Sequence, residues 1–117
     1  MPASKQTFFF VVSDLAKARG QVPSLSYSGN SSESFAAQLQ AALRKPGLWE
    51  RWRSMQPDPD AVDPALGASD PQATVAVEQA DMHTDVLVTT NLPHVVLKHR
   101  MDLLIGAHWT LRDVKAA

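Results

Sequence analysis

Residues 94–105, with the sequence HVVLKHRMDLLI, decide which topology this chain can adopt. If the segment is a helix, Arg100 falls inside the apolar arc. If it is a strand, alternate residues share a face. One strand face then carries Val95, Leu97, His99, Met101, Leu103 and Ile105. The two-residue period fits the sequence better, so it predicts a strand.

The other strand-like segments are shorter. TFFFVV (residues 7–12) is apolar on both of its alternating faces, which is typical of a strand in the middle of a sheet. ATVAVEQA (73–80) and TDVLVTT (84–90) are rich in β-branched residues and are separated by a polar turn, so they predict a hairpin. HWTLRDV (108–114) predicts a last strand.

Two helices are expected between the first strand and the hairpin. Asn30 and Glu33 are spaced as a variant capping box, and Pro46-Gly47 ends the helix that they begin. A second, short helix is expected over LWERWRSM (48–55). The segment 56–71 follows with four prolines and four aspartates, which excludes a regular element and predicts a loop.

Together these elements predict a single α+β domain over residues 1–117, with the Pro/Asp-rich loop at 56–71. The expected sheet is mainly antiparallel, has four to five strands and is packed on one face by a helical pair. The predicted order is β-α-α-β-β-β-β. If residues 94–105 are helical instead, the alternative is a ferredoxin-like β-α-β-β-α-β order.

Composition limits the class of protein. Of the 117 residues, 44% are hydrophobic and 20% are charged, as in a globular domain. The absence of cysteine excludes disulfides, zinc–thiolate sites and cysteine nucleophiles. No apolar run reaches the length of a signal peptide or a membrane span. We therefore expect a soluble, cytoplasmic protein of bacterial type without a membrane partner.

Charge is distributed unevenly along the chain, although the net charge is only −1. Residues 1–53 carry seven basic and three acidic side chains, whereas residues 54–97 carry seven acidic and no basic ones. Residues 98–117 carry four basic and two acidic side chains. A nearly neutral total favours parts that face each other within one fold over a basic surface for an acidic partner.

The first candidate site is the alternating series Asp81, His83 and Asp85. Imidazole and carboxylate groups on one strand face suit zinc or manganese, or a proton transfer. However, the series falls where a hairpin turn is expected, and turns are rich in aspartate for local reasons. The sequence therefore favours a turn and predicts no cofactor. A small metal-binding protein or enzyme that uses these three residues is the alternative.

The second candidate site lies in the aromatic and basic segment 43–53. Trp49 is expected at the boundary of its helix, beside Arg44, Arg51 and Arg53, and such residues are enriched at protein interfaces. The same residue types suit single-stranded nucleic acid, but the chain lacks the basic excess of such binders. We therefore expect a protein partner or a homodimer here, with nucleic acid as the least favoured alternative.

No nucleophile, base and stabiliser occur in a recognisable order, so the sequence favours a binding protein over an enzyme. We expect an accessory protein of regulatory or adaptor type that acts through protein–protein contacts or self-association. Edge strands offer it a further means of pairing with another sheet.

Overall fold

The computed structural model describes residues 5–29, 31–80 and 82–116. Its helices and strands are, in chain order, β1 (Gln6–Val12), α1 (Ser32–Arg44), α2 (Gly47–Ser54), β2 (Thr74–Gln79), β3 (Thr84–Thr90), α3 (His94–Ile105) and β4 (Trp109–Ala116). Two short 3₁₀ helices, η1 (Pro59–Ala61) and η2 (Pro64–Gly67), lie between α2 and β2.

The four strands form one sheet in the order β2-β3-β1-β4, and every neighbouring pair is antiparallel. The α+β class and the antiparallel sheet are therefore confirmed, as is the predicted order from β1 to β3. The sixth element is different, because residues 94–105 form the helix α3 and not a strand. With α3 between β3 and β4, the arrangement is the ferredoxin-like alternative, to which α2 is added.

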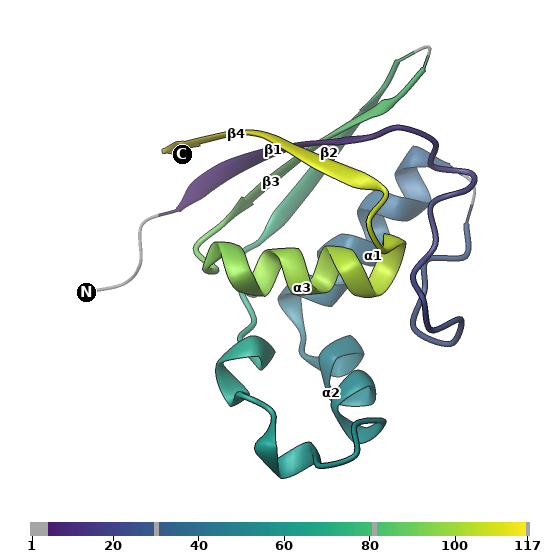
Figure 1. The fold of residues 1–117 in the computed structure, drawn as a ribbon. Coiled ribbons are helices and arrows are strands. Elements are labelled where there is room, and N and C mark those ends of the chain that lie inside the picture. The colour runs from purple at the N-terminus through teal and green to yellow at the C-terminus, as the bar shows by residue number, and fades with distance from the viewer. Residues whose placement is uncertain (1–4, 30, 81, 117) are drawn as a thin grey trace.

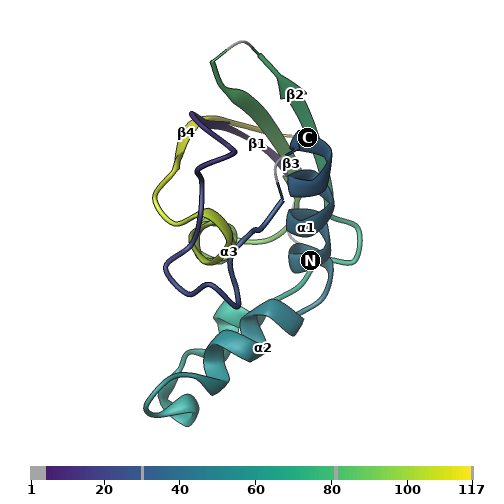
Figure 2. The same cartoon turned by 90° about the vertical axis from the view of Figure 1, so that its right-hand side faces the viewer.

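The molecule is built in three layers (Figures 1 and 2). The sheet forms the first layer, and α1 and α3 pack side by side against one of its faces. The third layer, formed by α2 and the segment around η1 and η2, lies beyond these helices. The sheet is thus covered on one face, as predicted, but the covering pair is α1 with α3 instead of α1 with α2. The core between the first two layers is formed by Phe8, Phe10, Val12, Val86, Val88, Phe35, Leu39, Leu43, Leu97, Met101 and Leu104.

The prediction of a strand at 94–105 was wrong because it treated Arg100 as unsuited to an apolar helix face. Arg100 does lie on that face and is fully buried. Its guanidinium donates hydrogen bonds to three backbone carbonyls, those of Ala42, Leu66 and Ala68. A buried charge whose donors are satisfied in this way is compatible with a helix interior.

Segment 56–71 is an ordered loop with two 3₁₀ turns, and its end is fixed by a buried carboxylate. The Asp70 side chain accepts hydrogen bonds from the Thr90 hydroxyl and from the backbone N–H groups of Gln72 and Asn91. Burial opposes ionisation of Asp70, but these hydrogen bonds outweigh burial and hold its pKa below the ordinary value. Asp70 therefore joins the loop to the turn between β3 and α3.

Candidate functional site

The face of the sheet that points away from the helices has no covering layer in the described part of the chain (Figures 1 and 2). The buried positions Phe8, Phe10 and Val12 face the helices, so the alternate residues of β1 point outward. The register then defines the outer face by Thr7, Phe9 and Val11 of β1, Asp85, Leu87 and Thr89 of β3, Ala76 and Glu78 of β2, and Thr110, Asp113 and Lys115 of β4.

The centre of the outer face is apolar. Phe9 lies directly opposite Leu87 of β3, and Val11 follows on the same face of β1. All three side chains are only half-buried. They line a shallow depression of about 500 Å³. We call Phe9, Val11 and Leu87 the apolar strip.

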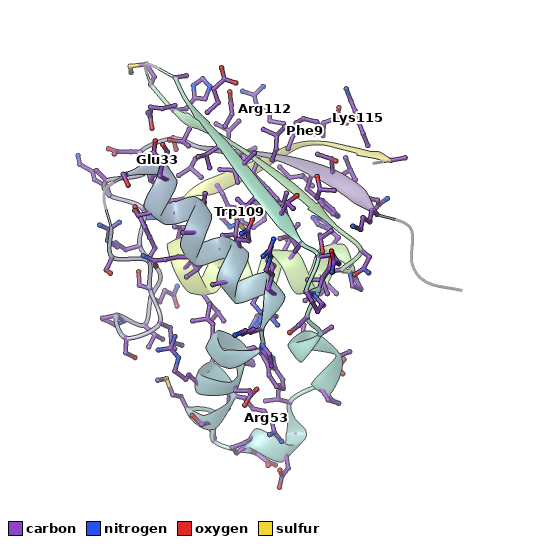
Figure 3. All side chains as sticks on the ribbon, turned by 180° about the vertical axis from the view of Figure 1, so that it is seen from behind. Phe9, Glu33, Arg53, Trp109, Arg112 and Lys115 are labelled. Carbon is purple, nitrogen blue, oxygen red and sulfur yellow. The ribbon has the colours of Figure 1, made fainter. Side chains whose placement is uncertain are left out.

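Charged side chains flank the apolar strip. Glu78 of the edge strand β2 lies opposite Asp85 of β3, and both line the depression on one side. Lys115 and Arg112 line it from β4, the opposite edge. Lys115 Nζ lies 5.5 Å from the centre of the Phe9 ring and 3.9 Å from the Asp113 carboxylate. Figure 3 shows Phe9, Arg112 and Lys115 close together on this side of the sheet.

A local irregularity in β4 lets two consecutive residues, Arg112 and Asp113, line this face. The register of β4 against β1 shifts between Phe9, which pairs with Asp113, and Phe10, which pairs with Leu111. Arg112 is therefore an extra residue in β4, as in a β-bulge. A bulge breaks the regular alternation of side chains, and here both Arg112 and the next residue, Asp113, join the lining of the depression.

The structure brings together two members of the predicted Asp81, His83 and Asp85 series. His83 Nε2 lies 3.2 Å from Asp85 Oδ1, and both side chains are partly exposed at the rim of the outer face. Asp81 lies outside the described residues. Among the residues that are described, no cluster of three or more histidine, cysteine or acidic side chains is arranged to hold a metal ion.

The expected position of Trp49, at the boundary of its helix, is wrong. Trp49 is only 7% exposed, and its ring lies against Gly67 in the third layer. Its indole Nε1 is buried and has no hydrogen-bond partner among the described residues. Trp49 belongs to the interior because η2 folds back over α2, a contact that the local sequence of the helix does not reveal.

Two of the three arginines that were grouped with Trp49 are also engaged within the chain. Arg44 Nε donates to the Ala73 carbonyl at 2.8 Å. Arg53 donates to the Pro59 carbonyl and pairs with Asp60 at 3.3 Å. Of these contacts, the Arg53–Asp60 pair joins a charge of the basic N-terminal part of the chain to one of the acidic segment. Arg51 is exposed and takes part in no ion pair among the described residues.

The two edges of the sheet offer little for pairing with another strand. At the β2 edge, the Val75 N–H donates to the Gln40 side chain of α1. At the β4 edge, the Val114 N–H donates to the Asp113 carboxylate at 2.8 Å. Charged side chains, a bulge and local caps on backbone groups are features that protect edge strands from pairing. The outer face is therefore the better candidate surface.

Comparisons of the chain with models of protein families, with curated proteins and with solved structures find no match. Within residues 5–29, 31–80 and 82–116, no helix is long and apolar enough to span a membrane.

Sequence reasoning did not single out the outer face, although one signal for it was present. The apolar positions on both faces of TFFFVV predicted a central strand, and β1 is central. Which residues of the other strands join Phe9 depends on the register, which a single sequence does not give. The bulge at Arg112 has no signal in the sequence.

Proposed function

We propose that the protein is a small binding protein that acts by self-association through the outer face of its sheet. The observation that carries this proposal is the apolar strip on the open face. A strand that is apolar on both faces is typical of a sheet covered on both sides. Within the described part of a single chain, helices cover only one side. A second sheet packed against the apolar strip would cover the other.

The charges beside the strip favour a second copy of the same chain as the partner. Glu78 and Lys115 lie on opposite edge strands, β2 and β4. Symmetric dimers use the same patch on both subunits. A two-fold axis that lies in the plane of the interface, at right angles to the line from Glu78 to Lys115, places the acidic side of one copy opposite the basic side of the other. Both copies then bury the same strip and gain complementary charges at its border.

The apolar contribution is tested with the double variant Phe9→Thr/Leu87→Thr. Threonine is β-branched and therefore suits a strand, but it removes apolar surface. We expect the dimer dissociation constant, measured by sedimentation equilibrium, to rise by at least about tenfold, since two large side chains lose a burial worth more than 1.4 kcal/mol. Val95→Thr is the matched control. Val95 is 61% exposed on α3, and valine and threonine have similar helix propensity. An unchanged constant in the double variant would refute the proposed interface.

The charge arrangement is tested by reversal. Glu78→Lys alone and Lys115→Glu alone should each weaken the dimer, whereas the two changes together should restore it. Within one copy the two side chains are separated by three strand spacings, roughly 14 Å, so they cannot pair directly. Recovery in the double reversal would therefore come from contacts between copies. Additive weakening in the double reversal would argue against the two-fold arrangement.

A further inference from the structure

We infer a second site, independent of the outer face: a pocket for a small organic phosphate where the loop after β1 meets α1 and α2. The loop descends toward α2 on the far side of α3 from the sheet (Figure 2). The pocket is open to solvent and has a volume of about 460 Å³, similar to that of the depression on the outer face. Its polar lining includes Ser24, Ser28, Lys45 and Arg51, and its floor includes Leu25 and Leu48.

The lining is positively charged. Lys45 follows α1 and Arg51 lies on α2, and both side chains are exposed. Neither takes part in an ion pair among the described residues. No carboxylate occurs among the described residues that line the cavity. By contrast, the nearby Arg44 and Arg53 are bound to loop carbonyls. The two cations of the pocket are thus available to an anion.

The hydrogen-bond donors suit a phosphate group better than a carboxylate. A guanidinium fork and an ammonium group both complement the oxygens of a phosphate. The hydroxyls of Ser24 and Ser28 line the same space, and within the described chain they have no hydrogen-bond partner. Gly47, at the start of α2, also lines the cavity, and the preceding Pro46 supplies no side-chain cap. Together these groups offer more donors than the two oxygens of a carboxylate use.

The apolar floor indicates that the ligand carries an organic part. Leu25, Leu48 and Leu104 are buried residues that line the base of the cavity. Inorganic phosphate would contact the cations but not the apolar part of the lining. A phosphate monoester with a small apolar group fills both parts, so we expect it to bind more tightly than phosphate alone.

The test is a titration of the isotope-labelled protein with phenyl phosphate, followed in the amide spectrum at constant ionic strength. We expect saturable shifts in the amides of Gly47, Leu48 and residues 24–28, with weaker binding of inorganic phosphate and of benzoate. Shifts that do not saturate, or that sodium chloride alone reproduces, would overturn the site. Benzoate that binds as tightly as phenyl phosphate would overturn the assignment to phosphates.

Charge-removing variants locate the site. Lys45→Gln and Arg51→Gln should each weaken phenyl phosphate binding by roughly tenfold, as expected for loss of one charge-assisted hydrogen bond. Lys17→Gln is the matched control, since Lys17 is exposed and does not line the cavity. The amide spectrum of each variant reports at once whether it is folded. Unchanged affinity in the folded double variant Lys45→Gln/Arg51→Gln would refute the pocket.

Discussion

At the scale of single residues, two buried charged side chains hold segment 56–71 in place. Arg100 of α3 binds the carbonyls of Leu66 and Ala68, and Asp70 binds the turn between β3 and α3. Burial lowers the pKa of Arg100 to about 10, so Arg100 remains charged at neutral pH. Neither residue takes part in an ion pair among the described residues, and backbone groups satisfy most of their hydrogen bonds. Their contribution is therefore to fix a loop that has no regular backbone pairing of its own.

Replacing Arg100 should destabilise the fold strongly. Arg100→Met keeps much of the side-chain volume but leaves the carbonyls of Ala42, Leu66 and Ala68 without their donor. Buried groups that lose their partners cost about 1–3 kcal/mol each, so we expect a loss of about 3 kcal/mol in urea unfolding. Lys98→Met, an exposed change on the same helix, should alter stability by less than about 0.5 kcal/mol. A loss this small in Arg100→Met would contradict the anchoring role.

Because of Asp70, we expect the free energy of unfolding to depend on pH in the acidic range. Its pKa is lower in the folded chain than in the unfolded chain, where it is about 3.9. The carboxylate therefore stabilises the fold fully above about pH 5, and this contribution is lost as the pH falls through 4 and below. Asp70→Asn should reduce the free energy of unfolding by about 1–2 kcal/mol at pH 7, and the difference from the unmodified chain should shrink toward pH 2.

The acid dependence is measured by urea unfolding at a series of pH values. Asp58→Asn is the control, because Asp58 is an exposed aspartate of the same segment. A difference between Asp70→Asn and the unmodified chain that stays constant from pH 7 to pH 2 would show that the ionised carboxylate contributes nothing.

At the scale of elements, α2 and η2 form one packed layer around Trp49. Gly67 of η2 approaches so closely that a Cβ atom there would lie 2.7 Å from the Trp49 ring. Arg53 of α2 lies over the same ring, 5.9 Å from its centre. The layer thus depends on a small residue at one position of the loop.

Two alanine variants test this packing. Gly67→Ala should destabilise the chain by about 1–3 kcal/mol, because the rigid indole ring must move to admit a methyl group. Gly47→Ala should be neutral or stabilising by up to about 1 kcal/mol, since a Cβ atom there meets nothing within 4 Å and alanine favours a helix. Thermal unfolding of both variants provides the measurement. Equal stability of the two variants would contradict the packing of η2 on α2.

Whether a helix or strand could be predicted from the sequence depended on whether local residues specify it. The helix α1 and the hairpin β2–β3 are specified by local periodicity and by turn residues, and both were predicted. The helix α3 was missed because Arg100 finds its carbonyl partners 32 to 58 residues away along the chain. Its flanks did carry helix signals: Pro93 stands before the first turn, and Gly106 follows the last with φ of +61°.

A candidate site could be predicted from the sequence only where its residues lie close together along the chain. The alternation of His83 and Asp85 is visible in the sequence, which nevertheless favoured a turn over a site, and the two side chains lie 3.2 Å apart. Trp49 was misplaced because η2, from a segment without periodicity, covers it. The outer face and the phosphate pocket bring together residues from several elements, and neither can be assembled without the register and the packing of the layers.

At the scale of the whole molecule, the three layers leave two surfaces of different character. The outer face of the sheet combines an apolar strip with opposite charges on its two sides. The pocket between α1, α2 and the loop after β1 is basic and hydroxyl-lined. In Figure 2, α1 and α3 lie between the sheet and α2. Because the two surfaces share no residue, a chain that dimerises through its sheet keeps the pocket accessible.

The measurement that tests the central claim most directly is the mass of the unmodified protein in solution, by sedimentation equilibrium over a range of concentrations. Self-association through the outer face predicts a mass that rises with concentration and levels off at twice that of one chain. A mass that stays at that of one chain up to about 1 mM, the weak end of specific binding, would contradict it.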